Sequence, residues 1–160
     1  MIKRNPKNTM WEMPKPLLRD AILHFFGEFH EYQWLDICAT KKNRKFLAYF
    51  SKKINALKQK LTKEFFYYCN PPFNDLATWV EFCHDQHLKR NCTVLMIVPC
   101  YTDSSWWTEH IGNQFQYVSD FKFLDDRLGF LINNKPVVNE KGKRQVYYMP
   151  CVWILWRSKN

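Results

Sequence analysis

Two kinds of hydrophobic pattern alternate in the middle of the chain. Residues 65–69 are β-favouring and mostly aromatic, and residues 92–99 are an apolar run of strand length that ends at a proline. Between these runs, Leu76, Val80 and Cys83 recur at spacings that place them on one face of a helix. The pattern predicts a strand, a helix and a second strand, with both strands buried in a parallel sheet.

The flanking segments extend this alternation. Leu18, Ile22 and Phe25 form the buried stripe of a helix that ends near Phe26. Together these patterns predict an α/β fold in a single domain spanning residues 1–160. The remaining predicted elements are a first central strand at 32–37, one or two basic surface helices within 41–63, strands at 115–123, 128–132 and 146–156, and a polar basic loop at 133–145.

The aromatic strand is stopped by the motif Asn70-Pro71-Pro72-Phe73. Two consecutive prolines can neither donate to a sheet ladder nor continue it, so the strand ends at Asn70. Open α/β sheets bind ligands in loops at the carboxyl ends of their strands. The carbonyl oxygens of Asn70 and Pro71 and the ring of Phe73 suit a planar base with an exocyclic amine. The plain alternative is a turn capped by Asn70, with Phe73 in the core.

Composition and charge narrow the class of protein. With 46% hydrophobic and 18% aromatic residues, the chain is expected to fold, and its 160 residues suffice for one domain. The net charge of +9 favours a polyanionic partner. Because no apolar stretch follows the charged N-terminus and no long apolar segment occurs, we expect an intracellular protein that is neither secreted nor membrane-bound.

The cysteines and histidines do not form a metal-binding pattern. The six cysteines are dispersed and lie mostly within apolar segments, which fits buried reduced thiols. Cys83, His84, His87 and Cys92 are close in sequence but lack a Cys-x-x-Cys pair, and Cys83 falls on the buried helix face. We therefore predict no metal site.

The Asn70-Pro71-Pro72-Phe73 motif resembles the catalytic (Asp/Asn/Ser)-Pro-Pro-(Tyr/Phe/Trp) motif of methyltransferases that use S-adenosylmethionine to methylate amino groups of bases. The flanking sequence, from Trp11 to about residue 156, resembles the small phage-type DNA N-6-adenine methyltransferase (Dam-like) family. This resemblance implies a Rossmann-like methyltransferase fold, a three-layer α/β sandwich with a truncated, mostly parallel sheet. It also implies methyl transfer to the exocyclic amine of a flipped adenine, without a separate target-recognition domain.

In that chemistry, the motif residues have separate roles. Asn70 and the Pro71 carbonyl would accept the hydrogens of the amine, Pro72 would keep the loop rigid, and Phe73 would stack on the base. No covalent enzyme intermediate is needed, so no cysteine takes part.

Two segments resemble the cofactor-binding parts of the family. Trp11 and Pro14 match a Trp-x-Thr-Pro segment that helps to hold the methionine end of the cofactor. Asp36 and Ala39, with Cys38 between them, match a Leu-Asp-x-x-Ala segment, and Asn70 is also expected to contact the cofactor. From the residues alone, a carboxylate at a strand end can bind an amine or hydroxyl, or can cap a helix beginning near Lys41.

Two aromatic and basic segments are candidates for contact with DNA. Trp106, in a segment similar to the family's Val-Pro-x-x-Thr-Asp-x-x-Trp-Trp, is expected either to wall the base pocket or to pack beneath a helix. Arg127, in a segment similar to Gly-Arg-x-x-Phe, is a candidate phosphate or base contact, with a surface salt bridge as the alternative. Lys135, Lys143 and Arg144 lie in the basic loop, which is long enough to be functional.

Two other functions stay open at this point. A cytosine amine presents similar chemistry to the motif. A non-catalytic, basic nucleic-acid-binding protein with a decayed methyltransferase fold is favoured by three departures from the family pattern: Met13 replaces a threonine, Tyr101 a basic residue and Asp126 a glycine. The sequence also leaves open a homodimer or a role as an accessory subunit.

Overall fold

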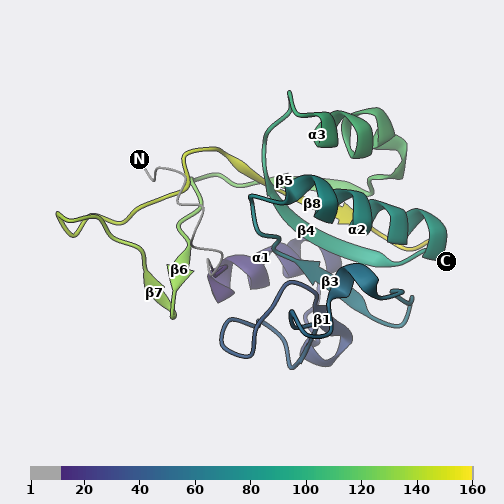
Figure 1. Cartoon of the computed structure of the whole chain (residues 1–160), viewed down its shortest axis with the longest axis horizontal. Coiled ribbons are helices and arrows are strands. Elements are labelled where there is room, and N and C mark those ends of the chain that lie inside the picture. Colours follow the sequence, from purple (N-terminus) through teal and green to yellow (C-terminus); the bar gives the residue numbers. More distant parts are fainter. Residues whose placement is uncertain (1–11, 160) are drawn as a thin grey trace.

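A six-stranded sheet forms the centre of the protein (Figure 1). The structure is a computed structural model that describes residues 12–159. The sheet, in the spatial order β2-β1-β3-β4-β8-β5, consists of β1 (Trp34–Asp36), β2 (Ala48–Tyr49), β3 (Phe66–Cys69), β4 (Thr93–Pro99), β5 (Asp120–Phe123) and β8 (Cys151–Trp156). A separate hairpin is formed by β6 (Leu131–Ile132) and β7 (Lys135–Pro136).

Helices pack on both faces of the sheet. They are α1 (Lys15–Phe26), α2 (Leu76–Arg90) and α3 (Ser105–His110), with 3-10 helices at Glu31–Gln33, Ala56–Lys58 and Gly112–Tyr117. Val80 of α2 and Trp107 of α3 lie in one core cluster, whereas Leu18 of α1 lies in a second. Met96 and Ile97, neighbours in β4, enter the first and the second cluster respectively. The central strand is thus covered on both sides, as its apolar sequence predicted.

Five of the six strands run in the same direction. β2, β1, β3 and β4 pair in parallel, β8 runs antiparallel to β4, and β5 runs antiparallel to β8 and so shares the direction of β4. The chain moves outward one way from β1 to β2 and the other way from β3 to β4. β1 and β3 therefore flank the point where the strand order reverses, which is where open α/β sheets bind ligands.

The strand, helix and strand predicted for the middle of the chain are confirmed. β3 ends at Cys69, one residue before the predicted end at Asn70, and α2 begins at Leu76. The α2 residues predicted to face the core, Leu76, Val80 and Cys83, are all buried. α2 ends where Asn91 takes a left-handed conformation with φ of 54°, a common way to stop a helix.

The first central strand is shorter than predicted. Residues 31–33 form a 3-10 helix, and the strand covers only Trp34–Asp36 instead of 32–37. Its pairing with β3 begins at Trp34 and Phe66, and within residues 12–159 no strand pairs with Tyr32. Tyr32 is accordingly 73% exposed. Its preference for β-structure did not extend the strand, because there is no neighbouring strand for it to pair with in the described chain.

The basic segment 41–63 contains no α-helix, so that prediction was wrong. Ala48–Tyr49 pairs in parallel with β1 instead, and the N–H of Phe50 donates to the carbonyl oxygen of Asp36 at 2.8 Å. Phe46 and Leu61 are buried in different clusters, whereas Leu47 is 70% exposed. The apolar residues of this segment therefore do not share one buried helix face. The segment instead adds β2 to the edge of the sheet, where the sequence predicted a truncated sheet.

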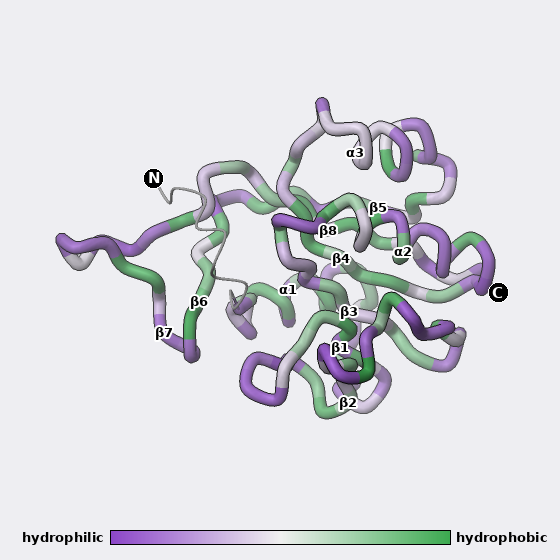
Figure 2. Tube along the Cα trace, in the orientation of Figure 1, coloured by the Kyte–Doolittle hydropathy of each residue, from purple (hydrophilic) through white to green (hydrophobic). Residues whose placement is uncertain are grey.

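The last third contains less strand than predicted. Only the ends of the three predicted strands, β5, β6 and β8, are extended, and residues 112–117 form a 3-10 helix. The predicted basic loop holds β7, which pairs with β6. This hairpin and the loop that follows project from the body of the molecule (Figure 1). Figure 2 shows that the tip of this projection is hydrophilic, in contrast to β4 and β8.

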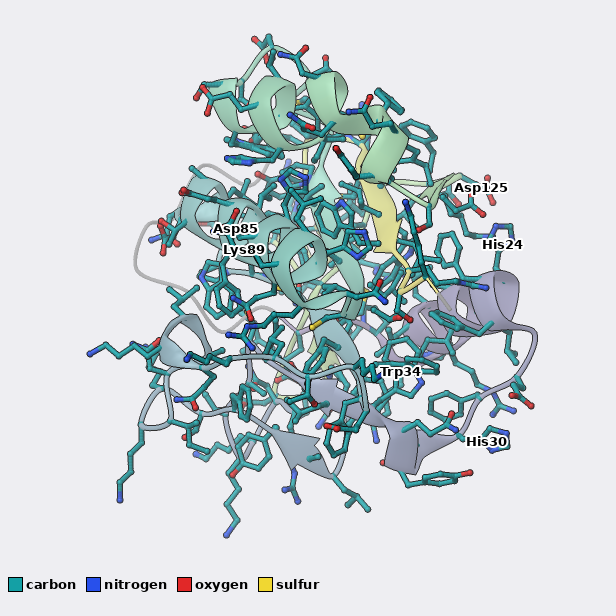
Figure 3. The ribbon with its side chains drawn as sticks, turned by 90° about the vertical axis from the view of Figure 1, so that its right-hand side faces the viewer. His24, His30, Trp34, Asp85, Lys89 and Asp125 are labelled. Atoms are coloured by element: carbon teal, nitrogen blue, oxygen red, sulfur yellow. The ribbon has the colours of Figure 1, made fainter. Side chains whose placement is uncertain are left out.

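The outer face of α2 is charged. Asp85 and Lys89 form an ion pair one helical turn apart on this face (Figure 3). Over residues 12–159, the helices are too short or too polar for any of them to span a bilayer.

Candidate active site

A cleft of ≈ 880 Å³ lies at the carboxyl ends of the parallel strands. Residues from the loops after β1, β2, β3 and β4 line it. Its wall is completed by Glu12, Met13, Phe130, Tyr147 and Tyr148. Its volume is within the range typical of sites for small molecules and cofactors. The cleft therefore has both the position and the size of a ligand site.

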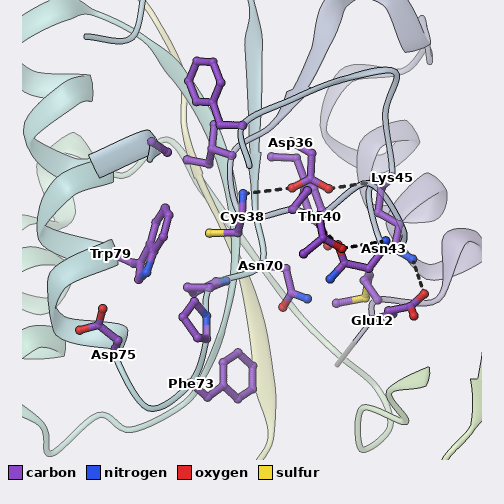
Figure 4. Close-up of a pocket in the computed structure, with 18 of the residues that line it drawn as sticks. Glu12, Asp36, Cys38, Thr40, Asn43, Lys45, Asn70, Phe73, Asp75 and Trp79 are labelled. Carbon is purple, nitrogen blue, oxygen red and sulfur yellow. Dashed lines mark hydrogen bonds and ion pairs between the residues drawn. The ribbon is translucent and has the colours of Figure 1, made fainter. Parts of the chain in front are cut away.

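The Asn70-Pro71-Pro72-Phe73 loop lies in the middle of this cleft, and all four residues line it (Figure 4). The carbonyl oxygen of Pro72 accepts the N–H of Asp75 at 2.9 Å, which closes the turn into α2. In the described part of the chain, no backbone N–H donates to the carbonyl oxygen of Pro71. The loop is thus fixed at both ends and presents a backbone carbonyl in addition to the half-buried Asn70 side chain.

Asp36 lies at the end of β1, across the strand-order reversal from the loop, and is 3% exposed. Its Oδ2 accepts the backbone N–H of Lys45 at 3.0 Å, and its Oδ1 that of Cys38 at 3.2 Å. Burial raises the pKa of Asp36 to about 6, because these hydrogen bonds only partly offset the loss of water around the carboxylate. The site thus holds a buried acid whose charge a cationic ligand would stabilise.

A polar wall extends from Asp36 on the side of the cleft away from α2 (Figure 4). Asn43 Oδ1 accepts hydrogen bonds from the backbone N–H of Thr40 at 2.6 Å and from its hydroxyl at 2.9 Å. Next to them, Lys45 Nζ pairs with Glu12 Oε2 at 3.4 Å, and both side chains are only 4% exposed. On the opposite side of Asn70, Asp75 and Trp79 line the cleft from the loop after β3 and from α2 (Figure 4).

Aromatic side chains enclose the end of the cleft around Phe73. Its ring packs edge-on against Phe130 and Tyr147, with ring centroids 5.5 Å and 5.0 Å away. The hydroxyl of Tyr101 is hydrogen-bonded to those of Tyr147, at 2.8 Å, and Tyr148. Burial and these hydroxyl contacts raise the pKa of Tyr147, so its phenol stays uncharged. Tyr101, which departs from the family pattern, is integrated into a well-bonded aromatic wall.

Most residues predicted to bind the cofactor lie at the cleft. Asp36, Cys38, Ala39 and Asn70 all line it. Pro14 precedes α1 and is not among the lining residues, whereas its neighbours Glu12 and Met13 are. Trp11 lies outside the described residues.

The residues predicted to contact DNA do not form one group. Arg127 donates a hydrogen bond to the backbone carbonyl oxygen of Tyr148 rather than pairing with a neighbouring aspartate. Lys135 and Lys143 are exposed on the projecting hairpin and its loop, while the guanidinium of Arg144 donates to the Gly129 carbonyl oxygen at 3.3 Å. Trp106 is 9% exposed and packs in the core, and it borders a smaller hollow beside Phe73 instead of the main cleft.

Sequence reasoning missed several residues of the cleft, notably Glu12, Lys45, Tyr68, Tyr147 and Tyr148. The bonds from Lys45 to Glu12 and from Asn133 to Glu12 join segments that are far apart in the chain. Tyr147 and Tyr148 fell within the strand predicted at 146–156, where aromatic residues are common and give no signal that they line a cleft.

The cysteines and histidines named in the sequence analysis pack in the core or form hydrogen bonds within the protein. Cys38 and Cys69 approach with their sulfur atoms 3.5 Å apart, and the structure contains them as free thiols. His84 pairs with His110 at 3.3 Å between α2 and α3, and His87 bonds to the carbonyl oxygen of Cys92 at 2.9 Å. Among residues 12–159, no group of three or more side chains is placed to hold a metal ion.

The fold and site define an α/β protein whose ligand cleft combines a buried acid with an Asn-Pro-Pro-Phe loop at the reversal of strand order. The model of the family described as DNA N-6-adenine-methyltransferase (Dam) matches residues 3–159, and the chain belongs to this family. Methyltransferases of the family act on adenine in DNA and generally use S-adenosylmethionine. A comparison with curated proteins gave no match.

Proposed function

We propose that this protein transfers the methyl group of S-adenosylmethionine to the exocyclic N6 of an adenine flipped out of DNA. The observation that carries this proposal is the Asn70-Pro71-Pro72-Phe73 loop, which shares one cleft with Asp36 at the reversal of strand order. The proposal joins the family assignment to the chemistry of these side chains.

The residues of the cleft fit the cofactor. S-adenosylmethionine supplies an electrophilic methyl group on a positively charged sulfur. The buried carboxyl of Asp36 offers a partner for a cationic or hydroxyl group, and Phe50 and Trp79 offer flat apolar surfaces for an adenine ring. Cys38 and Ala39, which follow Asp36, are small enough for a ligand to approach the backbone closely.

The loop residues activate the target amine. The Asn70 side-chain oxygen and the Pro71 carbonyl oxygen accept the two N6 hydrogens, which draws the nitrogen lone pair out of conjugation with the ring. The nitrogen then bonds to the methyl carbon as the sulfur–carbon bond breaks, and the amine loses one proton to solvent. Pro72 limits movement of the loop, so the acceptors are in place before the base arrives.

The aromatic end of the cleft holds the flipped base. Phe73 stacks on the purine, while Tyr147 and Phe130 keep the Phe73 ring in position through their edge-on contacts. Base flipping costs a few kcal/mol of unstacking, which such a pocket offsets. The exposed lysines of the projecting hairpin and its loop, together with the net charge of +9, favour contact with the phosphate backbone.

A methyl-transfer assay tests this function. The purified protein is incubated with unmethylated DNA and S-adenosylmethionine carrying a labelled methyl group, beside Asn70→Ala and the control Asn113→Ala, which changes an exposed residue outside the cleft. We expect label in DNA with the wild type and the control, and a loss of at least about 100-fold with Asn70→Ala. Transfer that survives in Asn70→Ala would refute the role of the loop, and a lack of transfer by the wild type would favour a non-catalytic nucleic-acid-binding protein.

A further inference from the structure

Lys45 has a position that methyl transfer itself does not explain. Its side chain lines the cleft, is 4% exposed, and carries an ammonium group with three N–H donors. Within the described part of the chain, this ammonium donates to Glu12 Oε2 at 3.4 Å. Burial lowers the pKa of Lys45, while the charge of Glu12 favours the protonated form. A buried cation with donors to spare at a ligand cleft points to an anionic group of the ligand.

Glu12 is itself firmly held, so it fixes the position of Lys45. Its Oε1 accepts the backbone N–H of Asn133 at 2.9 Å, and its backbone pairs in both directions with Leu131 at 2.9 Å. Lys45 is fixed at its other end, because its backbone N–H donates to Asp36. The ammonium group is therefore held at the cleft wall by two separate parts of the fold.

A second donor for the ligand lies on the neighbouring strand. Tyr68 of β3 is directly opposite Asp36 in the sheet, lines the cleft, and is 1% exposed. Its hydroxyl has no hydrogen-bond partner among residues 12–159. Leaving a buried hydroxyl unbonded is unfavourable, and a ligand atom that bonds to it removes this penalty.

The charges of Asp36, Glu12 and Lys45 complement a ligand that has the carboxylate and ammonium of an amino acid and one additional positive charge. Two carboxylates, Asp36 and Glu12, accompany one ammonium, that of Lys45, so the region has one net negative charge when Asp36 is ionised. S-adenosylmethionine has a carboxylate, an ammonium and a sulfonium, and thus one net positive charge. A phosphate group of DNA would meet two carboxylates and a buried site, so it fits less well.

We propose that Lys45, positioned by Glu12, binds the carboxylate of the amino-acid end of the cofactor, with the hydroxyl of Tyr68 as a second donor. This inference rests on the proposed function, since it names the residues that recognise one end of its cofactor. The ammonium of the same end faces Asp36.

Calorimetric binding of two ligands tests the assignment. One is S-adenosylmethionine, and the other is its decarboxylated analogue, which lacks only the group assigned to Lys45. We expect the wild type to prefer the carboxylate-bearing ligand by about 10- to 100-fold, the range for a charge-assisted hydrogen bond, and Lys45→Gln to bind both ligands about equally. The control Lys53→Gln, which removes an exposed charge outside the cleft, should keep the wild-type preference.

Two further variants guard against loss of folding. Glu12→Gln combined with Lys45→Gln removes both members of the buried pair, so that neither is left as an unpaired charge, and should show the same loss of preference. Tyr68→Phe removes only a hydroxyl that has no partner in the described chain, and should lower the preference about 3- to 10-fold without unfolding the protein.

The outcomes separate this inference from the proposed function. If the wild type binds and transfers methyl groups but Lys45→Gln keeps the full preference for the carboxylate, the assignment of Lys45 is wrong and the proposed function stands. If the wild type binds neither ligand, with or without DNA, the proposed cofactor is wrong and the inference falls with it.

Discussion

Replacing Asp36 by asparagine should remove an unfavourable contribution to folding that the ionised Asp36 carboxylate makes at neutral pH. The carboxyl is 3% exposed and burial raises its pKa from 3.8 to about 6. The ionised form is thus disfavoured in the folded state relative to the unfolded state. A pKa difference of this size corresponds to about 3 kcal/mol of free energy of unfolding. Because asparagine has no charge, Asp36→Asn lacks this pH dependence.

The raised pKa of Asp36 determines whether the free energy of unfolding rises or falls with pH. The favourable contribution of protonated Asp36 is complete below pH 3.8 and is lost as the pH rises through about 6. The free energy of unfolding of the wild type minus that of Asp36→Asn should therefore fall by about 3 kcal/mol from about pH 4 to about pH 7. Urea unfolding of both proteins across this range measures the difference, and contributions from other titrating groups cancel. A difference that is constant, or that rises with pH, would refute the reasoning.

Three further results are expected. Affinity for S-adenosylmethionine should fall about tenfold per pH unit below about 6, because protonation of Asp36 removes its charge, and Asp36→Asn should abolish this dependence; equal pH profiles would count against Asp36 as a cofactor ligand. Phe73→Ala should lower kcat/KM for DNA about 10- to 100-fold, the effect of one lost base stack, whereas Phe73→Tyr should retain most of it; equal losses would exclude stacking. Lys143→Gln should reduce the salt dependence of DNA binding by about one counterion, whereas Lys89→Gln, which breaks an ion pair on the outer face of α2, should not; equal slopes would remove the basic loop from the DNA interface.

The parts of the fold that the sequence predicted are those in which local and tertiary preferences agree. In β3 and α2, the aromatic run, the two prolines and the helical spacing of Leu76, Val80 and Cys83 all indicate the same structure, and the structure agrees. The Asn-Pro-Pro-Phe loop could be placed because it follows such a strand. Asp36 could be placed for a similar reason, since it ends an apolar segment.

The failures share one physical cause, which is dependence on a partner that is remote in the chain. The segment 41–63 has near-helical spacing, yet it pairs with β1 because Phe50 bonds to the backbone of Asp36. The strand predicted at 32–37 begins only at Trp34, because β3 begins at Phe66, which pairs with Trp34, and so does not reach the two residues before it. Propensity and periodicity describe neighbours along the chain and hold no information about such pairings.

The polar wall of the cleft shows the same limit for single side chains. Glu12 and Lys45 are 33 positions apart, and Glu12 and Asn133 are 121 apart. Lys45 is one of nine Lys and Arg residues in the segment 41–63, and nothing in the sequence indicates that its side chain is the buried one. Only the folded arrangement distinguishes it from its solvated neighbours.

The central claim is that the Asn70 loop directs a methyl group to the N6 of adenine, and identification of the methylated nucleoside tests it most directly. DNA containing all four bases is incubated with the protein and S-adenosylmethionine, digested completely and analysed by mass spectrometry. The account predicts N6-methyldeoxyadenosine, which disappears with Asn70→Ala. N4-methyldeoxycytidine as the product, or no methylated nucleoside from any DNA substrate, would contradict it.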